Sequence, residues 1–441
     1  MQTPIIDFVS KYAASDTARF HMPGHKGRGS LTVERLDITE INGADDLRCP
    51  EGIILSSERN ATELFGTAHT YYLTEGSTLG IKAMLTLAVG EGGRVLAARN
   101  AHKAFVHAAA LLDLSVEWLY PQNAEHICKC ELSAEEVRAA LSGMALIPDA
   151  VYVTSPDYLG NVLDIGAIAG VCDEFDIPLL VDNAHGAYLN FLSPSRHPIA
   201  LGATICCDSA HKTLPALTGA AYLHVSKKGE WYAERARSVI SLFSSTSPSY
   251  ITLQSLDYCN EYLSADYKEC LSDTVKALDG VKSALSKHGI IPEKSEPLKL
   301  VLKPMRFGYT ASRLAAMLRE AKIEPEFVDC EYVVLMVSTS NTQDELDKLL
   351  DFFLGLEILP MICECDKLSL PKHEQAISIR TAVFAKSEVL RVEDSVGRVC
   401  SLPTVSCPPA IAIVVSGEVI TSADVDIFKK YGIKTVEVAV L

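Results

Sequence analysis

Two ionisable residues near the middle of the chain lie where a charge is costly. Asp182 ends the apolar run at residues 179–181, and Lys212 closely follows the apolar run at residues 204–207. A carboxylate or an ammonium group at the end of a buried strand is unfavourable unless it finds a partner. A lysine that forms an imine with an aldehyde loses its charge, and a protonated ring nitrogen is an adequate partner for the aspartate. Together the two residues predict a cofactor that carries an aldehyde and a cationic ring.

A glycine and two hydroxyl groups follow an earlier apolar run and could bind a phosphate group. In the segment Leu-Thr-Glu-Gly-Ser-Thr-Leu-Gly at residues 73–80, a predicted strand ends, Gly76 allows a tight turn, and Ser77 and Thr78 lead into a helix. The free N–H groups of a helix N-terminus bind phosphate. Ser77 could equally be an ordinary helix cap.

Other residues at predicted strand ends complete the contacts that a planar cofactor needs. His102 follows the run Arg94–Ala98 and could lay its ring on the cofactor, although a lone histidine is more often a satisfied core residue. Ala184 is small enough to pack against the ring. Ser209 and His211, beside the lysine, could bind the phosphate from its other side. The order of these features along the chain, rather than any one of them, predicts pyridoxal 5′-phosphate (PLP) as the cofactor.

Three of these features have simpler interpretations. Asp182 and His185 could be a metal-binding pair, but no third ligand is evident in the sequence nearby. Lys212 could be a surface lysine, although apolar runs on both sides argue against exposure. The segment at residues 153–161, which contains Asp157, could border the cofactor ring or form a plain turn built on proline and glycine.

The elements that must position these residues alternate between helix and strand patterns over residues 61–226. Apolar runs of four to six residues predict strands that are buried on both faces. Strands that alternate with helices indicate an α/β fold with a mostly parallel sheet, in which ligands bind at the carboxyl ends of the strands. The predicted strands are residues 70–73, 94–98, 150–154, 178–181, 204–207 and 220–225, and the predicted helices are residues 60–65, 79–89, 103–112, 134–141 and 165–175.

The rest of the chain predicts further domains around this α/β core. Residues 1–60 form an N-terminal segment that looks irregular, and residues 227–285 read as long helices that complete a large domain at 61–285. Residues 286–356 predict a small α+β domain, with strands at 298–302 and 332–337 and helices at 311–321 and 341–355. Residues 357–441 predict a C-terminal α+β domain that includes a strand at 410–415.

Composition narrows the possible partners of the protein. The formal charge of −16 over 441 residues argues against sequence-independent binding of nucleic acid. The N-terminus lacks the pattern of a signal peptide and no apolar run approaches a membrane span, so we expect a cytoplasmic protein with no membrane partner. Thirteen cysteines in such a chain predict free thiols. The pairs Cys128/Cys130 and Cys363/Cys365, with His126 near the first, lack the usual spacing of zinc ligands, so no metal site is predicted.

A set of motifs along nearly the whole chain resembles a known family. They are HMPGHKG at 21–27, DITE at 37–40, EGST at 75–78, RNAHK at 99–103, VDNAHGA at 181–187, SAHKTLPALTGAAYLHV at 209–225 and SSTSPSY at 244–250. As a set they are similar to the ornithine/lysine/arginine decarboxylases of PLP fold type I. The resemblance implies an aspartate-aminotransferase-like α/β large domain with a smaller α+β domain and a C-terminal α+β domain. It also implies decarboxylation of lysine, arginine or ornithine to a diamine or polyamine precursor.

The resemblance implies roles for the residues at matching positions. Lys212 would carry PLP as a Schiff base, Asp182 would pair with the pyridine nitrogen, and His102 would stack on the ring opposite Ala184. After carbon dioxide leaves, Lys212 or His185 would return a proton to the α-carbon. The residues that would hold the phosphate beside Gly76 are Ser77, Thr78, Ser209 and His211.

The resemblance also implies an assembly and a substrate contact. The active site of this fold type lies at a dimer interface, so we expect at least a homodimer, in which the loop at residues 244–249 reaches the neighbour's phosphate. The distal cation of the substrate needs an acidic partner, for which Glu326, Asp329 and Asp157 are candidates. Asn183 and Asp157 stand where the family commonly has Glu and Thr, and the extra charge of Asp157 bears on substrate choice.

Two other functions remain open from the sequence. Aminotransferases of this fold usually bind the α-carboxylate with an arginine of the small domain, but no arginine lies between Pro325 and Met361. A paralogue that binds PLP without turnover belongs to a different class. Visible absorbance reports the bound cofactor, and release of carbon dioxide from basic amino acids separates an enzyme from such a paralogue.

Overall fold

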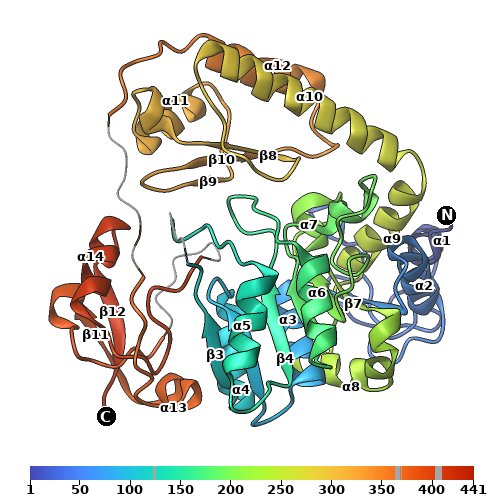
Figure 1. Cartoon of the computed structure of the whole chain (residues 1–441). Helices are drawn as coiled ribbons and strands as arrows, with labels where there is room; N and C mark the ends of the chain where they lie inside the picture. The colour runs from blue at the N-terminus through green and yellow to red at the C-terminus, as the bar shows by residue number, and fades with distance from the viewer. Residues whose placement is uncertain (123–125, 363–367, 369, 403–409) are drawn as a thin grey trace. The chain divides into compact units, whose positions relative to one another are not determined.

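The chain folds into two compact units, each built from several stretches of sequence (Figure 1). The computed structural model describes residues 1–122, 126–362, 368, 370–402 and 410–441. The first unit contains Met1–Leu96, Ala134–Ser155 and Asp164–Lys268, and the second contains Ala97–Ser133, Pro156–Leu163 and Glu269–Leu441. The domain bounds predicted at residues 60, 285 and 356 remain a prediction.

A mostly parallel sheet supplies the strand ends that carry the candidate site. Its strands are β1 (His69–Leu73), β2 (Arg94–Ala98), β3 (Ser115–Leu119), β4 (Ala150–Thr154), β5 (Leu179–Asp182), β6 (Ile205–Asp208) and β7 (Ala221–Val225). Their order is β1-β7-β6-β5-β4-β2-β3. Strands β4, β5 and β6 run parallel, whereas β7 is antiparallel to both β6 and β1. The expected α/β sheet is confirmed. Strand β3 was not predicted, because its first four residues alternate between exposed and partly buried and form no apolar run.

The first unit contains helices between these strands, as the alternating sequence pattern predicts, and further helices before and after them. They are α1 (Pro4–Ala14), α2 (Ile53–Phe65), α3 (Ser77–Ala88), α5 (Ala134–Gly143), α6 (Ile165–Glu174), α7 (Ala210–Thr213), α8 (Ala233–Phe243) and α9 (Tyr250–Ser264). Helix α3 packs on β5, β6 and β7, which places its N-terminus near the ends of the central strands. Among the residues described here, no helix combines the length and apolar character needed to span a bilayer.

The first helix corrects the expectation that residues 1–60 are irregular. Helix α1 has no side-chain cap from Thr3 at its N-cap position. Instead the Asp257 carboxylate of α9 accepts the backbone N–H groups of Ile5 and Ile6 at 2.9 and 3.0 Å. A carboxylate at a helix N-terminus satisfies orphan N–H groups and complements the helix dipole. Because this cap lies 251 to 252 residues away in the sequence, local reading could not find it.

The second unit contains a small α+β domain with its own core. Strands β8 (Lys299–Leu302), β10 (Val333–Met336) and β9 (Phe327–Val328) form an antiparallel sheet, in the order β8-β10-β9. Helices α10 (Tyr267–His288), α11 (Ala311–Glu320) and α12 (Gln343–Leu354) pack apolar side chains against it (Figure 1). The predicted α+β pattern is therefore found. The remaining elements are α4 (Lys103–Leu112), α13 (Ile379–Phe384), β11 (Ser387–Arg391), α14 (Ser422–Lys430) and β12 (Thr435–Ala439).

The strand predicted at residues 410–415 is not formed, because an arginine side chain takes its hydrogen bonds. Arg99 is fully buried and donates to the carbonyl groups of Ala412 and Ile413 at 3.1 and 3.4 Å. Its guanidinium group also binds both oxygens of Glu418 at 2.6 Å. The buried segment thus satisfies its carbonyl groups through a charged side chain instead of a strand partner. The sequence pair Cys363/Cys365 lies outside the described residues.

Candidate active site

Asp182 is the last residue of β5 and is a buried carboxylate with few donors. Its side chain accepts the Ala184 N–H at 3.2 Å and the Tyr152 hydroxyl at 3.3 Å, and the residue is 2% exposed. Burial raises the pKa of Asp182, and the charge of Lys212 and these two hydrogen bonds only partly offset the rise. A carboxyl group in this state gains from a cation placed beside it.

Lys212 and His185 come together from the two segments that follow β6 and β5. Lys212 lies in the short helix α7, half-buried, and its Nζ is 3.3 Å from Nε2 of the buried His185. The charge of Lys212 also acts on the Asp182 carboxyl, so amine and carboxylate share one region of the first unit. Ala184, the small residue predicted to face the ring, is buried between Asp182 and His185 in the sequence. Asp182 and His185 belong to no group of three potential metal ligands among the described residues.

The N-terminus of α3 lies beside α7 and is not capped by a side chain. Gly76 occupies the N-cap position with a φ of +74°, a conformation that favours glycine. Ser77 is the first helical residue, so it is not the cap that the sequence allowed for. The Ser77 hydroxyl is 2.9 Å from the hydroxyl of Ser209, and the exposed Thr78 follows it. The predicted hydroxyls from two separate segments therefore meet at an open helix N-terminus.

Close packing of backbone brings this helix terminus to the end of β6. A Cβ atom at Gly80 would lie 2.8 Å from the Cβ of Cys207 and 3.1 Å from Leu73, so only glycine lets α3 approach so closely. The N–H of Gly76 donates to the carbonyl of Gly219 at 2.8 Å, which ties the turn to the segment after Lys212. Glycines in the motif thus serve helix–sheet packing as well as the turn.

His211 is held in the same region by the backbone. Its Nδ1 is 2.9 Å from the carbonyl of Ala220, which makes Nδ1 the protonated nitrogen. Burial lowers the pKa of His211, and the charge of Lys212 lowers it further. The side chain is therefore a neutral imidazole at neutral pH.

Asp208 at the end of β6 is a buried acid to which the sequence reading gave no role. Its carboxylate oxygens accept hydrogen bonds from Nε2 of His197 at 2.9 Å, from Nε2 of His224 at 3.2 Å and from the side-chain amide of Asn183 at 2.7 Å. Burial alone would raise the pKa of Asp208, but the two histidines outweigh it and the pKa is lowered. The carboxylate explains why position 183 carries an amide, since an ionised glutamate there has no hydrogen to donate. The spacing of the two histidines along the chain gave no signal of this cluster.

His102, the predicted stacking residue, belongs to the second unit. It is the N-cap of α4, and its Nδ1 accepts the backbone N–H of Ala104 at 3.1 Å. The ring is half-buried. A capping imidazole has a fixed orientation and a fixed tautomer, with the proton on Nε2.

The three acidic candidates for the distal cation also lie in the second unit, and two of them are engaged in local structure. Asp157 accepts the N–H of Cys130 at 3.0 Å and both donors of Asn161 at 2.9 and 2.6 Å. Burial raises the pKa of Asp157 to about 6 despite these hydrogen bonds. Asp329 contacts His126 at 2.9 Å. Glu326 is exposed and accepts the Tyr158 hydroxyl at 2.7 Å.

Comparison with known proteins identifies the family. Residues 3–303 match the model of the major domain of Orn/Lys/Arg decarboxylases. The chain belongs to this decarboxylase family. The arginine decarboxylase of Halalkalibacterium halodurans is 30% identical, over 96% of this chain and 92% of that protein. The arginine decarboxylase of Bacillus subtilis is 28% identical, over 97% and 93%. The lysine decarboxylase of Francisella novicida has the same fold, with a TM-score of 0.83, 16% identity and coverage of 99% of this chain and 81% of that one.

This decarboxylase is a fold type I enzyme and its cofactor is PLP. Three features of the first unit fit that group. The α3 N-terminus has no side-chain cap and carries the Ser77–Ser209 hydroxyl pair, which suits a phosphate. The Asp182 carboxyl is buried with a raised pKa, which suits a protonated pyridine nitrogen. Lys212 supplies the amine that an aldehyde requires.

Proposed function

We propose that this enzyme decarboxylates a basic amino acid, with arginine as the first candidate substrate and lysine or ornithine as the others. The relatives at 30% and 28% identity are named arginine decarboxylases, and they match 96% and 97% of this chain. The observation that carries the proposal is the buried Asp182 carboxyl, which shares its region with the Lys212 amine. This arrangement suits PLP chemistry at an amino-acid α-carbon.

The residues at the positions that match the family's motifs would hold the cofactor. Lys212 would bind its aldehyde carbon, Asp182 would face its pyridine nitrogen, and Ala184 and His102 would lie against its ring. When bound, PLP supplies an electron sink for the bond that breaks at the α-carbon. The phosphate ligands would be Gly76, Ser77, Thr78, Ser209 and His211.

Asp182 and the pair Lys212–His185 would perform the remaining tasks. A cation beside Asp182 favours its ionised form, and the ionised carboxylate in turn keeps a proton on the ring nitrogen. Lys212 Nζ and His185 Nε2 are 3.3 Å apart, so a proton held between them can move to either atom. From there it can be delivered to the α-carbon once carbon dioxide has left. Burial of His185 excludes water from this path.

The distal cation of the substrate would bind Glu326 in preference to the other two acids. Asp157 receives two donors from Asn161 in its own loop and one from the backbone N–H of Cys130, and Asp329 is turned toward His126. Glu326 has an exposed carboxylate that the Tyr158 hydroxyl holds in place. We further propose a homodimer in which the loop at residues 244–249 approaches the neighbour's phosphate. In this chain its Ser245 N–H donates to Glu75, directly before the phosphate-binding turn, at 3.1 Å.

The test is release of carbon dioxide from arginine, lysine and ornithine by the purified holoenzyme. Lys212→Ala should abolish release, while Lys227→Ala, at an exposed lysine of the same unit, should retain it. Release from arginine at the highest kcat/KM is the expected result. Keto-acid formation without carbon dioxide would establish an aminotransferase instead. PLP binding without turnover of any basic amino acid would establish a non-catalytic paralogue.

A further inference from the structure

A buried lysine at the start of β8 has no part in the chemistry described above. Lys299 is 0% exposed, and an ammonium group is costly to bury unless it finds partners. Its Nζ lies 2.8 Å from a carboxylate oxygen of the buried Glu296. The same Nζ donates to the backbone carbonyls of Asp157 and Tyr158, both at 3.2 Å. Apolar residues of similar volume often stabilise a fold as well as a buried ion pair does, so Lys299 is better explained by the turn that it holds.

The turn at residues 157–160 is fixed against the segment that precedes β8. The carbonyl of Gly160 accepts the N–H of Glu296 at 2.7 Å. Gly160 has a φ of +84°, and a Cβ atom there would lie 2.9 Å from the Cβ of Ser295, so a side chain would force the two segments apart. Together with the ammonium group of Lys299, these contacts hold the turn in one orientation.

The fixed turn places the side chain of Tyr158 against Glu326. The Tyr158 hydroxyl donates to Oε1 of Glu326 at 2.7 Å, and its ring meets the ring of Phe327 edge-on with centroids 5.1 Å apart. Nζ of Lys299 lies 5.6 Å from the centre of the same tyrosine ring. Tyr158 is buried, whereas Glu326 is exposed. The phenol therefore orders a carboxylate that is still open to a cationic ligand.

Glu326 and Lys299 belong to the same small sheet. Glu326 lies directly before β9, and its N–H donates to the carbonyl of Val334 at 2.9 Å. Lys299 is the first residue of β8 and pairs in register with Met336. Because β10 contains both Val334 and Met336, one central strand connects the backbone of the lysine to that of the carboxylate.

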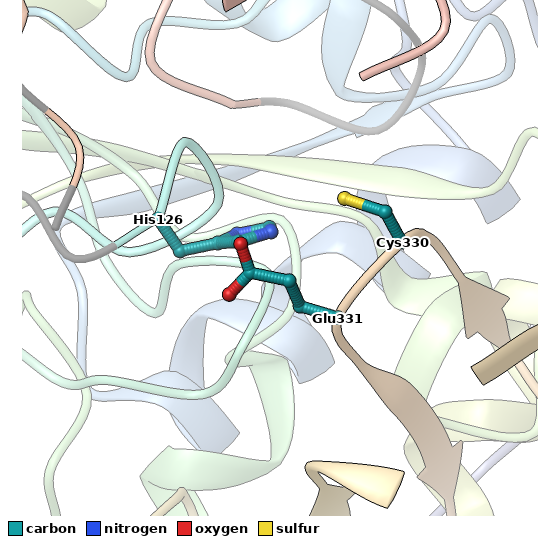
Figure 2. A group of neighbouring side chains, drawn as sticks. All are labelled: His126, Cys330 and Glu331. Carbon is teal, nitrogen blue, oxygen red and sulfur yellow. The ribbon is translucent and has the colours of Figure 1, made fainter. Parts of the chain in front are cut away.

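The turn between β9 and β10 anchors the far end of the hairpin that begins at Glu326. Nδ1 of His126 accepts the N–H of Cys128 at 3.1 Å, so the imidazole proton is on Nε2, which lies 2.9 Å from Oδ2 of Asp329. Burial alone would raise the pKa of Asp329, but His126 and the backbone donors outweigh it and the pKa is lowered. Figure 2 shows the Glu331 carboxylate of this turn beside the His126 ring. Of the acids in this hairpin, Glu326 is the exposed one.

We propose that Lys299 is a positioning residue for the distal cation of the substrate, which it orders through Tyr158 and Glu326. On the proposed function, on which this role rests, these residues set the selectivity for basic over uncharged amino acids. Lys299 fixes the turn, the turn fixes the Tyr158 hydroxyl, and the hydroxyl fixes one oxygen of Glu326. A carboxylate that is already ordered loses less conformational freedom when a ligand binds, so the ligand binds more tightly. Tyr158 is therefore a specificity residue, and Lys299 acts through it without touching the substrate.

The test compares purified holoenzymes on the best basic substrate and on norleucine, which has no distal cation. Lys299→Met combined with Glu296→Gln removes both charges of the buried pair, so no unpaired charge is left in the core. KM for the basic substrate should rise about tenfold, while kcat and the affinity for norleucine stay as in the wild type. Tyr158→Phe, which removes a single oxygen atom, should give the same pattern with a rise of about fivefold. The visible absorbance of the bound cofactor reports the affinity for norleucine.

Further variants separate this role from the proposed function. Lys276→Met, at an exposed lysine of the same unit, is the control and should leave KM unchanged. Glu326→Gln should raise KM for the basic substrate more than either positioning change. A raised KM in Glu326→Gln, with wild-type KM in the Lys299 and Tyr158 variants, would overturn the positioning role and leave the proposed function standing. An equal loss of affinity for norleucine in those variants would also overturn it. Absence of carbon dioxide release by the wild type from every basic amino acid would instead overturn the proposed function itself.

Discussion

Two buried carboxylates at the ends of adjacent strands differ sharply in their surroundings. Asp182 ends β5 and Asp208 ends β6, and both are at most 2% exposed. Asp208 receives two histidines and an amide, and its pKa is lowered because these partners outweigh its burial. Asp182 accepts hydrogen bonds from one backbone N–H, one phenol and the weakly donating thiol of Cys207, and its pKa is raised because burial dominates. The protein's own side chains satisfy the Asp208 carboxylate, whereas a bound cation would stabilise the Asp182 carboxylate.

The difference separates a structural acid from a functional one. A buried carboxylate surrounded by donors and positive charge stabilises the fold. A buried carboxylate with a raised pKa destabilises the protein when ionised, and such a cost is common where a ligand is to bind. From this comparison we propose that Asp182 faces the cofactor and that Asp208 supports the end of β6.

The largest effect is expected from removal of the charge at Asp182. Asp182→Asn should lower kcat/KM for decarboxylation by about a thousandfold, or about 4 kcal/mol, because the amide cannot keep the ring nitrogen protonated. The folded protein should be at least as stable without cofactor as the wild type. Steady-state kinetics and denaturant unfolding measure the two quantities. Asp266→Asn, at an exposed aspartate, is the control, and an equal loss there or full activity in Asp182→Asn would contradict the assignment.

Loss of the charge at Asp208 should mainly lower the stability of the protein and should affect its activity much less. Asp208→Asn leaves two buried histidines without their shared carboxylate, so the free energy of unfolding should fall by about 3 kcal/mol. Activity per molecule of folded holoenzyme should change much less than in Asp182→Asn. Chemical denaturation followed by tryptophan fluorescence gives the stability. An Asp208→Asn variant as stable as the wild type would show that the network does not support the fold.

A smaller effect is expected from the amide that binds Asp208. Asn183→Ala removes a 2.7 Å hydrogen bond to a buried charged oxygen, which should cost about 2 kcal/mol of stability. The double variant Asn183→Ala/Asp208→Asn should lose less than the sum of the two single losses, because both changes act on one contact. Additive losses in this double-mutant cycle would show that the contact contributes nothing.

The smallest expected effect is a difference in how the stability contributions of the two acids depend on pH. The raised pKa of Asp182 means that its cost to the cofactor-free protein is full above that pKa and disappears as pH falls through it toward the ordinary value. The stability gap to Asp182→Asn should therefore close on acidification. The lowered pKa of Asp208 means that its contribution persists until pH falls below about 3.9, the ordinary value. Its gap to Asp208→Asn should stay constant from pH 7 to about 5. Gaps that change in the same direction over this range would contradict the comparison.

Much of the candidate site could be predicted because it follows local rules. Apolar runs bounded by polar residues located β1, β2, β4, β5, β6 and β7, and a polar residue after a run marks a strand end. Asp182, Ser77 and Lys212 were found in this way, and the structure brings them into the first unit with Ser209 and His185. Their roles toward PLP stay predictions until the cofactor is mapped.

The features that escaped prediction depend on partners distant in the sequence. Helix α1 is capped by Asp257, and the strand expected at residues 410–415 is replaced by contacts with Arg99. The contacts of Asp208 with His197 and His224 depend on the pairing of β6 with β7, which the local sequence does not indicate. Local sequence patterns predict helices, strands and strand ends. Pairing between charged residues that lie far apart in the sequence becomes visible only in the three-dimensional structure.

The central claim is that Lys212 binds the cofactor in the region of Asp182. Reduction of the holoenzyme with borohydride, followed by peptide mass spectrometry, tests it directly. The result we predict is a single phosphopyridoxyl group on the peptide that contains Lys212. The same experiment on Lys212→Ala should give no modified lysine. A phosphopyridoxyl group on a different lysine of the wild-type enzyme, or none at all, would contradict the account.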